Sequence, residues 1–235
     1  MEYNIGMLIP VCSRNQNYTD ISSTPLFSTF LKHFENNRSK HYNYIFFIGV
    51  DDNDDFYLAN KNHFTSAGMN VVILSDCNHK PAKAWNKLLD EAIKHDIDYF
   101  FQIGDDIELL TTEDWTARFI NKLKDMDNIG IVGPCNSINY ICRINIGKPL
   151  IIENVFFHRR HHQMFGTLFH ESIDNWYCDD WIFGVYNSFN RAYTFTDILC
   201  SNNITGGRYN IKDIPEINKY IQEGIDLILK KEYLT

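Results

Sequence analysis

Hydrophobic and polar positions along the first half of the chain form two alternating patterns. Apolar runs of strand length stand at 3–11, 44–50, 70–74, 99–103 and 129–132. Between these runs, apolar side chains recur at helical spacing over 24–34, 56–67, 81–95 and 113–124. Pro25 and Pro81 stand at first-turn positions of two of these helices. Strands that alternate with helices predict an α/β fold with a mostly parallel central sheet sandwiched by helices.

Polar residues follow each of the first four predicted strands. The segments are Cys12 to Asn15, Asp51 to Asp55, Asp76, and Gly104 to Asp106. Because ligands of open α/β sheets bind beyond the carboxyl ends of the strands, we expect these segments to share one rim. Asp and Asn are also ordinary turn residues, so each segment taken alone is either part of a metal site or a solvated turn.

The pair Asp105 and Asp106 differs from the other acidic segments, because only Gly104 separates it from the apolar run 99–103 and it precedes Ile107 and Leu109. Adjacent carboxylates at the end of a buried strand are costly unless a cation neutralises them. One or two carboxylates, completed by water and diphosphate oxygens, describe a Mg²⁺ or Mn²⁺ nucleotide site. We therefore predict Mn²⁺ or Mg²⁺ as the cofactor.

The common phosphate-binding motifs are absent from the sequence. No GxGxxG follows the first strand, and no GxxxxGK[ST] occurs anywhere. A bound diphosphate would then be held by metal and by side chains such as Arg14, Lys80 and Lys83, the last two at the start of the helix over 81–95. The alternative for the two lysines is a solvated first helical turn.

Composition narrows the class of protein. The 235 residues carry a formal net charge of −8, which disfavours general binding to nucleic acid. The six cysteines form no CxxC pair, so we expect buried free thiols. No stretch reaches the length of a membrane span and no signal peptide precedes the first strand, so we expect a cytoplasmic protein.

Five segments, in order along the first 200 residues, resemble the GT-A glycosyltransferases, and most closely their family 2-like branch. They are 7–14, 47–52, 80–86, the DXD-like 102–107, and 165–181 with its acidic pair. The resemblance implies one GT-A domain over 1–235, with a small β/α extension on the acceptor side. Its parts would be a nucleotide-sugar half (1–110), an acceptor-side half (111–200) and a C-terminal loop and helix (201–235).

The resemblance also implies roles for individual residues. Those expected to bind the nucleotide-sugar are Pro10, Val11, Ser13, Arg14, Asp51, Asp52, Lys80, Lys83, Asn86, Asp105 and Gly166. The metal would be held mainly by Asp106, together with Asp105. Asp179 and Asp180 are the catalytic candidates.

The sequence departs from the family pattern at two places. Gly104 stands at the first position of the DXD triplet, and no histidine follows His170 where many members place a metal ligand. The missing histidine favours an inverting enzyme, in which one carboxylate serves as general base.

The resemblance therefore implies a glycosyltransferase that moves a sugar from a UDP-sugar to a hydroxyl of a glycan or protein. Asp179 or Asp180 would accept the proton of that hydroxyl, since the flanking aromatics Trp176, Tyr177 and Trp181 can raise a carboxylate pKa and stack on a sugar. The alternative for the pair is a simple cap on a helix that starts at Trp181.

Two other functions stay open at this point. One is a catalytically silent GT-A-like domain that binds carbohydrate or a protein partner, which Gly104 supports. The other is a sugar-phosphate nucleotidyltransferase, although Cys12 to Asn15 is not the Gly-rich, Lys-containing loop that such enzymes carry after the first strand.

The remaining motifs admit several interpretations. The run 158–162 (HRRHH) is a zinc site, an acceptor or phosphate contact through Arg159 or Arg160, or, by default, a partly exposed strand and loop. The run 205–209 (TGGRY) is a loop that closes over a nucleotide or an ordinary turn. The amphipathic helix over 214–229 is expected to pack on the core or on a partner, which leaves a homodimer open.

Overall fold

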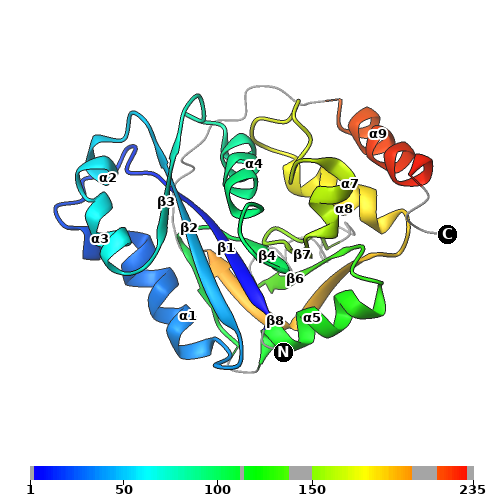
Figure 1. Cartoon of the computed structure of the whole chain (residues 1–235), viewed down its shortest axis with the longest axis horizontal. Coiled ribbons are helices and arrows are strands. Elements are labelled where there is room, and N and C mark those ends of the chain that lie inside the picture. The colour runs from blue at the N-terminus through cyan, green and yellow to red at the C-terminus, as the bar shows by residue number, and fades with distance from the viewer. Residues whose placement is uncertain (1–2, 112–113, 138–149, 203–215, 232–235) are drawn as a thin grey trace.

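The computed structural model describes residues 3–111, 114–137, 150–202 and 216–231. Within them, eight strands form one sheet in the order β3-β2-β1-β4-β7-β6-β8-β5 (Figure 1). The strands are β1 (Asn4–Val11), β2 (Asn43–Asp51), β3 (Asn70–Leu74), β4 (Tyr99–Gln102), β5 (Ile107–Leu109), β6 (Ile131–Asn136), β7 (Phe156–His158) and β8 (Ala192–Asn202).

The sheet is mostly parallel. Strands β3, β2, β1 and β4 run parallel to one another, and β6 is parallel to β8. Strand β7 is antiparallel to both β4 and β6, and β5 is antiparallel to β8. The predicted α/β class with a mostly parallel sheet is confirmed. The register pairs Val11 with Val50 and Asp51 with Leu74, so the first strands end at one common edge.

Helices cover both faces of this sheet. They are α1 (Lys32–Asn37), α2 (Asp55–Ala59), α3 (Lys61–Ser66), α4 (Pro81–Ala92), α5 (Trp115–Asp125), α7 (Arg160–Phe165), α8 (Cys178–Asn187) and α9 (Ile217–Lys230). A 3-10 turn (Ile21–Ser23) and a π-helical turn (Leu26–Leu31) precede α1.

The alternation of side chains along β1 separates two cores. Ile5, Met7 and Ile9 belong to the core shared with α1, α2, α3 and α5. Leu8 belongs to the core shared with α4, α7, α8 and α9. Figure 1 shows these two groups of helices on the two sides of the sheet. Both faces of the central strands are therefore buried, as near-continuous apolar runs require.

The helix expected over 56–67 is two short helices instead. The side-chain amide of Asn60 donates to the carbonyl oxygen of Phe56 at 2.8 Å, and Asn60 closes α2 before α3 begins. Asn commonly offers the backbone such an alternative to the helical hydrogen bond, which is why helical spacing alone missed the break. The strand expected over 129–132 also begins and ends later, as β6.

Helix α9 packs its apolar face against α8. A Cβ added at Gly184 would lie 2.6 Å from Cδ1 of Ile221, and one added at Gly224 would lie 2.6 Å from Cγ2 of Val185. The two glycines therefore allow the helices to approach closely, and the expectation that this helix packs on the core is confirmed. Across the described ranges, no helix combines the length and the apolar character that crossing a membrane requires.

The cysteines in the described part of the chain are buried free thiols, as expected. They are Cys12, Cys77, Cys135, Cys178 and Cys200. Cys142 lies outside the described residues.

Candidate functional site

The loop after β1 is ordered by Asp54, a residue outside the predicted set. The N–H and Oγ of Ser13 each donate to the Asp54 carboxylate at 2.7 Å. The same carboxylate accepts the N–H of Tyr57 at 3.1 Å and so caps α2. Ser13 therefore contributes its hydroxyl to loop geometry, and Pro10 and Val11 form the paired end of β1 that leads into the loop. Asp54 lies in the acidic segment 51–55, but spacing did not distinguish it from its neighbours.

Arg14 and Asp51 form an ion pair at the ends of β1 and β2. Nη2 of Arg14 lies 3.1 Å from Oδ2 of Asp51, and Nη1 lies 3.5 Å from Nδ1 of His79. Burial raises the pKa of Asp51, while the Arg14 guanidinium acts in the opposite direction. Asp52, the next residue, is exposed. The structure thus brings two predicted donor-site residues together and adds His79 from the loop after β3.

The start of α4 is joined to the loop that precedes α8. Nζ of Lys80 lies 3.4 Å from Oδ2 of Asp174, and the N–H of Ala82 donates to the carbonyl of Asp174 at 3.1 Å. The side chain of Asn175 donates to the carbonyl of His79 at 3.3 Å. Lys83 is half-buried in the first turn of α4. Of the predicted cations, Lys80 therefore lies at the contact between the start of α4 and the loop that precedes α8.

Asn86 makes three hydrogen bonds to the segment that follows α7. Its Oδ1 accepts the N–H groups of Leu168 at 3.1 Å and Phe169 at 2.7 Å, and its Nδ2 donates to the Phe169 carbonyl at 3.0 Å. Gly166 ends α7 at a φ of 77°, and a Cβ there would meet nothing within 4 Å. Asn86, predicted to line the nucleotide pocket, thus holds the segment that begins at Gly166.

Asp105 and Asp106 lie in the connection between β4 and β5 and are 1% and 5% exposed. A Cβ added at Gly104 would lie 2.7 Å from Oδ1 of Asp106, so this carboxylate occupies space that any side chain at residue 104 would need. The departure from the DXD pattern therefore has a direct steric consequence for Asp106.

The donor chemistry of this pair fits a hard divalent cation. In the residues that the structure describes, no three His, Cys, Asp or Glu side chains gather as a metal-binding group. A site with one or two carboxylates, completed by water and phosphate oxygens, needs no larger cluster. Asp105 and Asp106 supply two such carboxylates.

Helix α8 begins at Cys178, so the prediction of a helix that starts at Trp181 was wrong. Tyr177 adopts the left-handed conformation, with a φ of 75°, and its carbonyl accepts the N–H of Trp181 at 2.9 Å. Asp179 and Asp180 consequently lie inside the first turn, with Oδ1 of Asp179 accepting the N–H of Asp180 at 3.1 Å. The left-handed conformation of Tyr177 fixes where α8 begins, and sequence spacing does not reveal such a conformation.

The ionisation of Asp179, in the first turn of α8, is strongly shifted. Burial first, then the charges of Asp180 and Glu153, raise its pKa to about 7. Glu153 precedes β7 and accepts a hydrogen bond from Nδ2 of Asn136 at 2.9 Å. Sequence reasoning missed Glu153, because it belongs to no motif and reaches Asp179 only through the fold.

The histidine-rich run 158–162 ends β7 and opens α7, a helix that the default expectation of a strand and loop did not include. His161 is buried, with Nδ1 2.8 Å from the hydroxyl of Tyr186 and Nε2 3.0 Å from the carbonyl of Leu168. Burial lowers the pKa of His161 to about 4. The ring is therefore neutral at pH 7, donating from Nε2 and accepting at Nδ1, and it supports the same segment that Asn86 holds.

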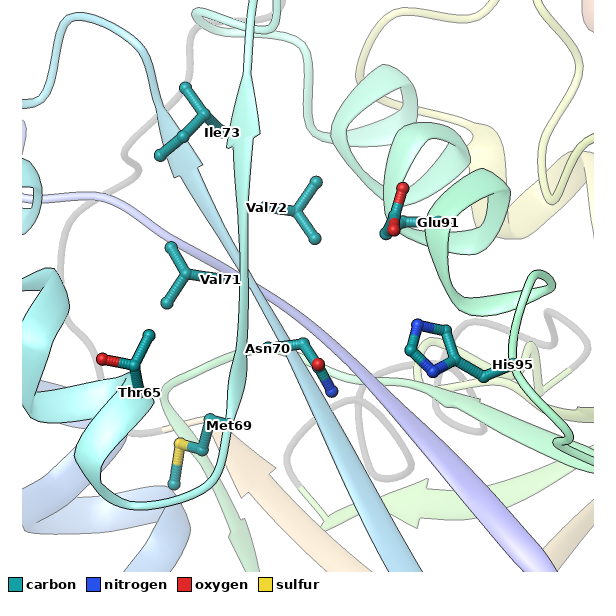
Figure 2. Close-up of a pocket in the computed structure, with 8 residues that line it drawn as sticks. All are labelled: Thr65, Met69, Asn70, Val71, Val72, Ile73, Glu91 and His95. Atoms are coloured by element: carbon teal, nitrogen blue, oxygen red, sulfur yellow. The ribbon is translucent and has the colours of Figure 1, made fainter.

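A cavity of about 410 Å³ lies along the edge strand β3, apart from these residues (Figure 2). Val72 and Asn70 point towards the side of Glu91 and His95 on and after α4, whereas Val71 and Ile73 point the other way. None of the predicted site residues lines this cavity. The predicted loop 205–209 lies outside the described residues.

No family model matches the sequence, and neither does any curated protein. Solved structures of glycosyltransferases, however, share the GT-A-like fold of this chain. One is the mannosyltransferase PcManGT from Pyrobaculum calidifontis, described in complex with GDP-Man and Mn²⁺. It aligns at a TM-score of 0.61 and 14% identity over 97% of this chain and 71% of its own.

TarS from S. aureus is a second structure with this fold. It aligns at a TM-score of 0.58 and 9% identity, over 100% of this chain and 41% of its own. Its 1–349 fragment, in complex with UDP, aligns at a TM-score of 0.54 and 9% identity, over 97% of this chain and 66% of its own. This chain therefore spans less than half the length of the longer TarS chain.

Proposed function

We propose that the chain is a metal-dependent glycosyltransferase that transfers a sugar from a UDP-sugar to a hydroxyl acceptor with inversion. One observation carries the proposal. The ends of β1, β2 and β4 bring Arg14, Asp51 and the pair 105–106 to the rim where an α/β sheet binds its ligand. Two structures with the same fold are described with GDP-Man and Mn²⁺ or with UDP.

On the donor side, Asp51 would accept a hydrogen bond from the nucleotide base, and Arg14 holds its carboxylate in place. Lys80 and Lys83 would attract the diphosphate at the start of α4. Asp106, with Asp105, would hold the divalent cation. That cation, when bound, supplies electrostatic stabilisation to the leaving diphosphate.

On the acceptor side, Asp179 would act as general base. The acceptor oxygen forms a bond to the anomeric carbon while the bond from that carbon to the diphosphate oxygen breaks. The proton of the hydroxyl passes to the Asp179 carboxylate, and the nucleoside diphosphate leaves. Burial and the neighbouring carboxylates raise the pKa of Asp179 towards neutral pH, which suits a base that works there.

A screen of nucleotide sugars tests the activity and the donor together. Purified protein with Mn²⁺ is incubated with each UDP-sugar and with GDP-mannose, and the released nucleotide is quantified by chromatography. We expect UDP release from at least one UDP-sugar. Release of GDP alone would overturn the donor assignment, and no release from any donor would favour the silent binding domain.

Calorimetry tests the metal assignment. Asp106→Ala is expected to weaken Mn²⁺-dependent binding of UDP by at least about tenfold, since one charge-assisted ligand is lost. Asp125→Asn, at an exposed position at the end of α5, is the matched control and should bind UDP as the unaltered protein does. Unchanged UDP binding by Asp106→Ala would contradict the assignment.

A further inference from the structure

Tyr57, on α2, carries a buried hydroxyl that makes no hydrogen bond. The residue is 0% exposed, and among the described residues this hydroxyl is the one fully buried side-chain polar atom without a partner. Two other buried tyrosines pair theirs. Tyr99 donates to Oδ1 of Asn128 at 3.1 Å, and the hydroxyl of Tyr186 lies 2.8 Å from Nδ1 of His161. Because burying an unpaired hydroxyl is unfavourable, the one on Tyr57 calls for a physical reason.

The fold does not need this hydroxyl to hold the ring of Tyr57. The backbone N–H of Tyr57 donates to Oδ1 of Asp54 at 3.1 Å, which caps α2. The ring centroid lies 5.3 Å from that of Phe56 and 6.1 Å from that of Phe64. A phenylalanine would make the same ring contacts and the same backbone bond. The oxygen atom is therefore not explained by packing.

Tyr57 lies near the connection between β4 and β5, which carries the proposed metal ligands. It belongs to the same hydrophobic core as Ile103 and Ile107, the residues on either side of the Gly-Asp-Asp segment. Burial first, and then the charge of Asp105, raise the pKa of Tyr57 well above its ordinary value, whereas the hydroxyl of Thr24 acts in the opposite direction. The hydroxyl of Tyr57 therefore stays protonated, as a hydrogen-bond donor.

Two other polar groups near Tyr57 already have partners. Oγ1 of Thr24 donates to the carbonyl of Ile21 at 2.8 Å and is not paired with Tyr57. The carboxylate of Asp54 accepts the N–H and Oγ of Ser13 and the N–H of Tyr57. Among the charged groups that act on the Tyr57 hydroxyl, Asp105 has the largest effect. The carboxylate of Asp105 is therefore the acceptor that best matches this donor.

We propose that Tyr57 is a positioning residue for Asp105, whose carboxylate accepts the Tyr57 hydroxyl when Asp105 and Asp106 hold the divalent cation. This inference rests on the proposed function. A carboxylate that binds a metal ion is usually oriented by a further hydrogen bond, and removing that donor weakens metal binding by roughly tenfold or more. The hydroxyl that is unpaired in the free protein thus gains its partner in the bound state.

The test compares Tyr57→Phe with a matched control, Tyr44→Phe. Tyr44 packs against the same core, and its hydroxyl lies 2.7 Å from Oγ1 of Thr116. Each substitution removes only a hydroxyl. Stability is measured by urea unfolding without metal or nucleotide. Binding of Mn²⁺ alone, and of UDP in the presence of Mn²⁺, is measured by calorimetry.

We expect Tyr57→Phe to weaken Mn²⁺-dependent binding of UDP by about tenfold. Its urea midpoint should stay the same or rise, because no hydrogen bond is lost in the free protein. Tyr44→Phe should show the opposite, a lower midpoint with unchanged UDP binding. Unchanged UDP binding by Tyr57→Phe would overturn the proposal. If the unaltered protein shows no Mn²⁺-dependent binding of UDP, the proposed function is contradicted instead.

A double-mutant cycle identifies the acceptor. Tyr57→Phe is combined with Asp105→Ala, which keeps Asp106, the residue expected to hold most of the metal. If the Tyr57 hydroxyl acts through Asp105, adding Tyr57→Phe to Asp105→Ala should weaken UDP binding by much less than tenfold. A full further tenfold loss would mean that the hydroxyl acts through another group, which contradicts the proposal.

A second readout follows the hydroxyl itself. Tyrosines are isotope-labelled at Cζ for NMR, and Tyr57→Phe identifies the resonance of Tyr57. Addition of UDP with Mg²⁺, which unlike Mn²⁺ is diamagnetic, should move this resonance downfield, because donation to a carboxylate deshields the carbon that bears the oxygen. The resonance of Tyr44 should stay in place. A Tyr57 resonance that does not move at saturation would show that no such hydrogen bond forms.

Discussion

Asn86 and Phe169, 83 residues apart in sequence, are joined by two hydrogen bonds: Oδ1 of Asn86 accepts the N–H of Phe169 at 2.7 Å, and Nδ2 donates to its carbonyl at 3.0 Å. With the third bond to Leu168, the amide of Asn86 replaces the backbone pairing that this irregular segment lacks. His161 supports the same segment from α7. The segment that follows α7 is thereby attached to α4, at whose start the two proposed donor-site lysines lie.

This attachment predicts that Asn86 contributes to stability. Asn86→Ala leaves two buried N–H groups and one carbonyl without partners, so the free energy of unfolding should fall by about 2–4 kcal/mol. Urea unfolding followed by circular dichroism measures the change. Asn62→Ala, at an exposed position on α3, should change it by less than about 0.5 kcal/mol. If Asn86→Ala leaves the urea midpoint of unfolding unchanged and weakens UDP binding, Asn86 would instead contact the nucleotide directly.

The ionisation of Asp179 predicts the pH dependence of transfer. Because the base must be ionised, kcat/KM should rise with pH through about 7. Asp180→Asn removes a negative charge that raises the pKa of Asp179, so the rising limb should move to lower pH. Asp179→Asn should abolish transfer and keep UDP binding. A rising limb that stays in place in Asp180→Asn would contradict the assignment of the limb to Asp179.

The same ionisation predicts a cost in stability. The pKa of Asp179 is higher in the folded protein than its ordinary value of 3.8, so the folded state holds this proton more tightly than the unfolded state does. The associated stability is present below about pH 4 and is lost as the pH rises through about 7. Asp179→Asn should therefore raise the melting temperature at pH 8 and change it much less at pH 4. Equal changes at both pH values would contradict this linkage.

Because Gly104 lies close to the Asp106 carboxylate, we expect a substitution at Gly104 to weaken UDP binding without much change in stability. Gly104→Ala places a Cβ 2.7 Å from Oδ1 of Asp106, so the carboxylate must turn away. We expect Mn²⁺-dependent UDP binding to weaken by about tenfold and the free energy of unfolding to change by less than about 1 kcal/mol. Calorimetry and urea unfolding measure the two quantities.

Gly184→Ala is the matched control for that variant. Its Cβ would lie 2.6 Å from Cδ1 of Ile221, in the contact between α8 and α9. It should lower the free energy of unfolding by about 1–3 kcal/mol and leave UDP binding unchanged. If both alanine variants weaken binding equally, the effect at Gly104 is not specific to Asp106.

The sequence by itself determined the alternation of strands and helices up to β6 and the residues at the ends of the first four strands, but not β5, β7 and β8. Apolar runs such as 99–103 must be buried, and a parallel arrangement of such strands brings their polar ends to one edge whatever the details of packing. For this reason the α/β class, and the meeting of Arg14 with Asp51, followed from local pattern.

Only the tertiary structure decided which polar groups contact one another across the chain. Asn86 was assigned to the nucleotide because its distant backbone partners, Leu168 and Phe169, leave no trace in local spacing. The charge of Glu153 raises the pKa of Asp179, and Trp176 is exposed while Trp181 is buried, because loops without periodicity are placed by long-range contacts. Hydrophobic periodicity shows which face of a helix or strand is apolar, but it does not show which distant residues that face contacts, and it says nothing about loops.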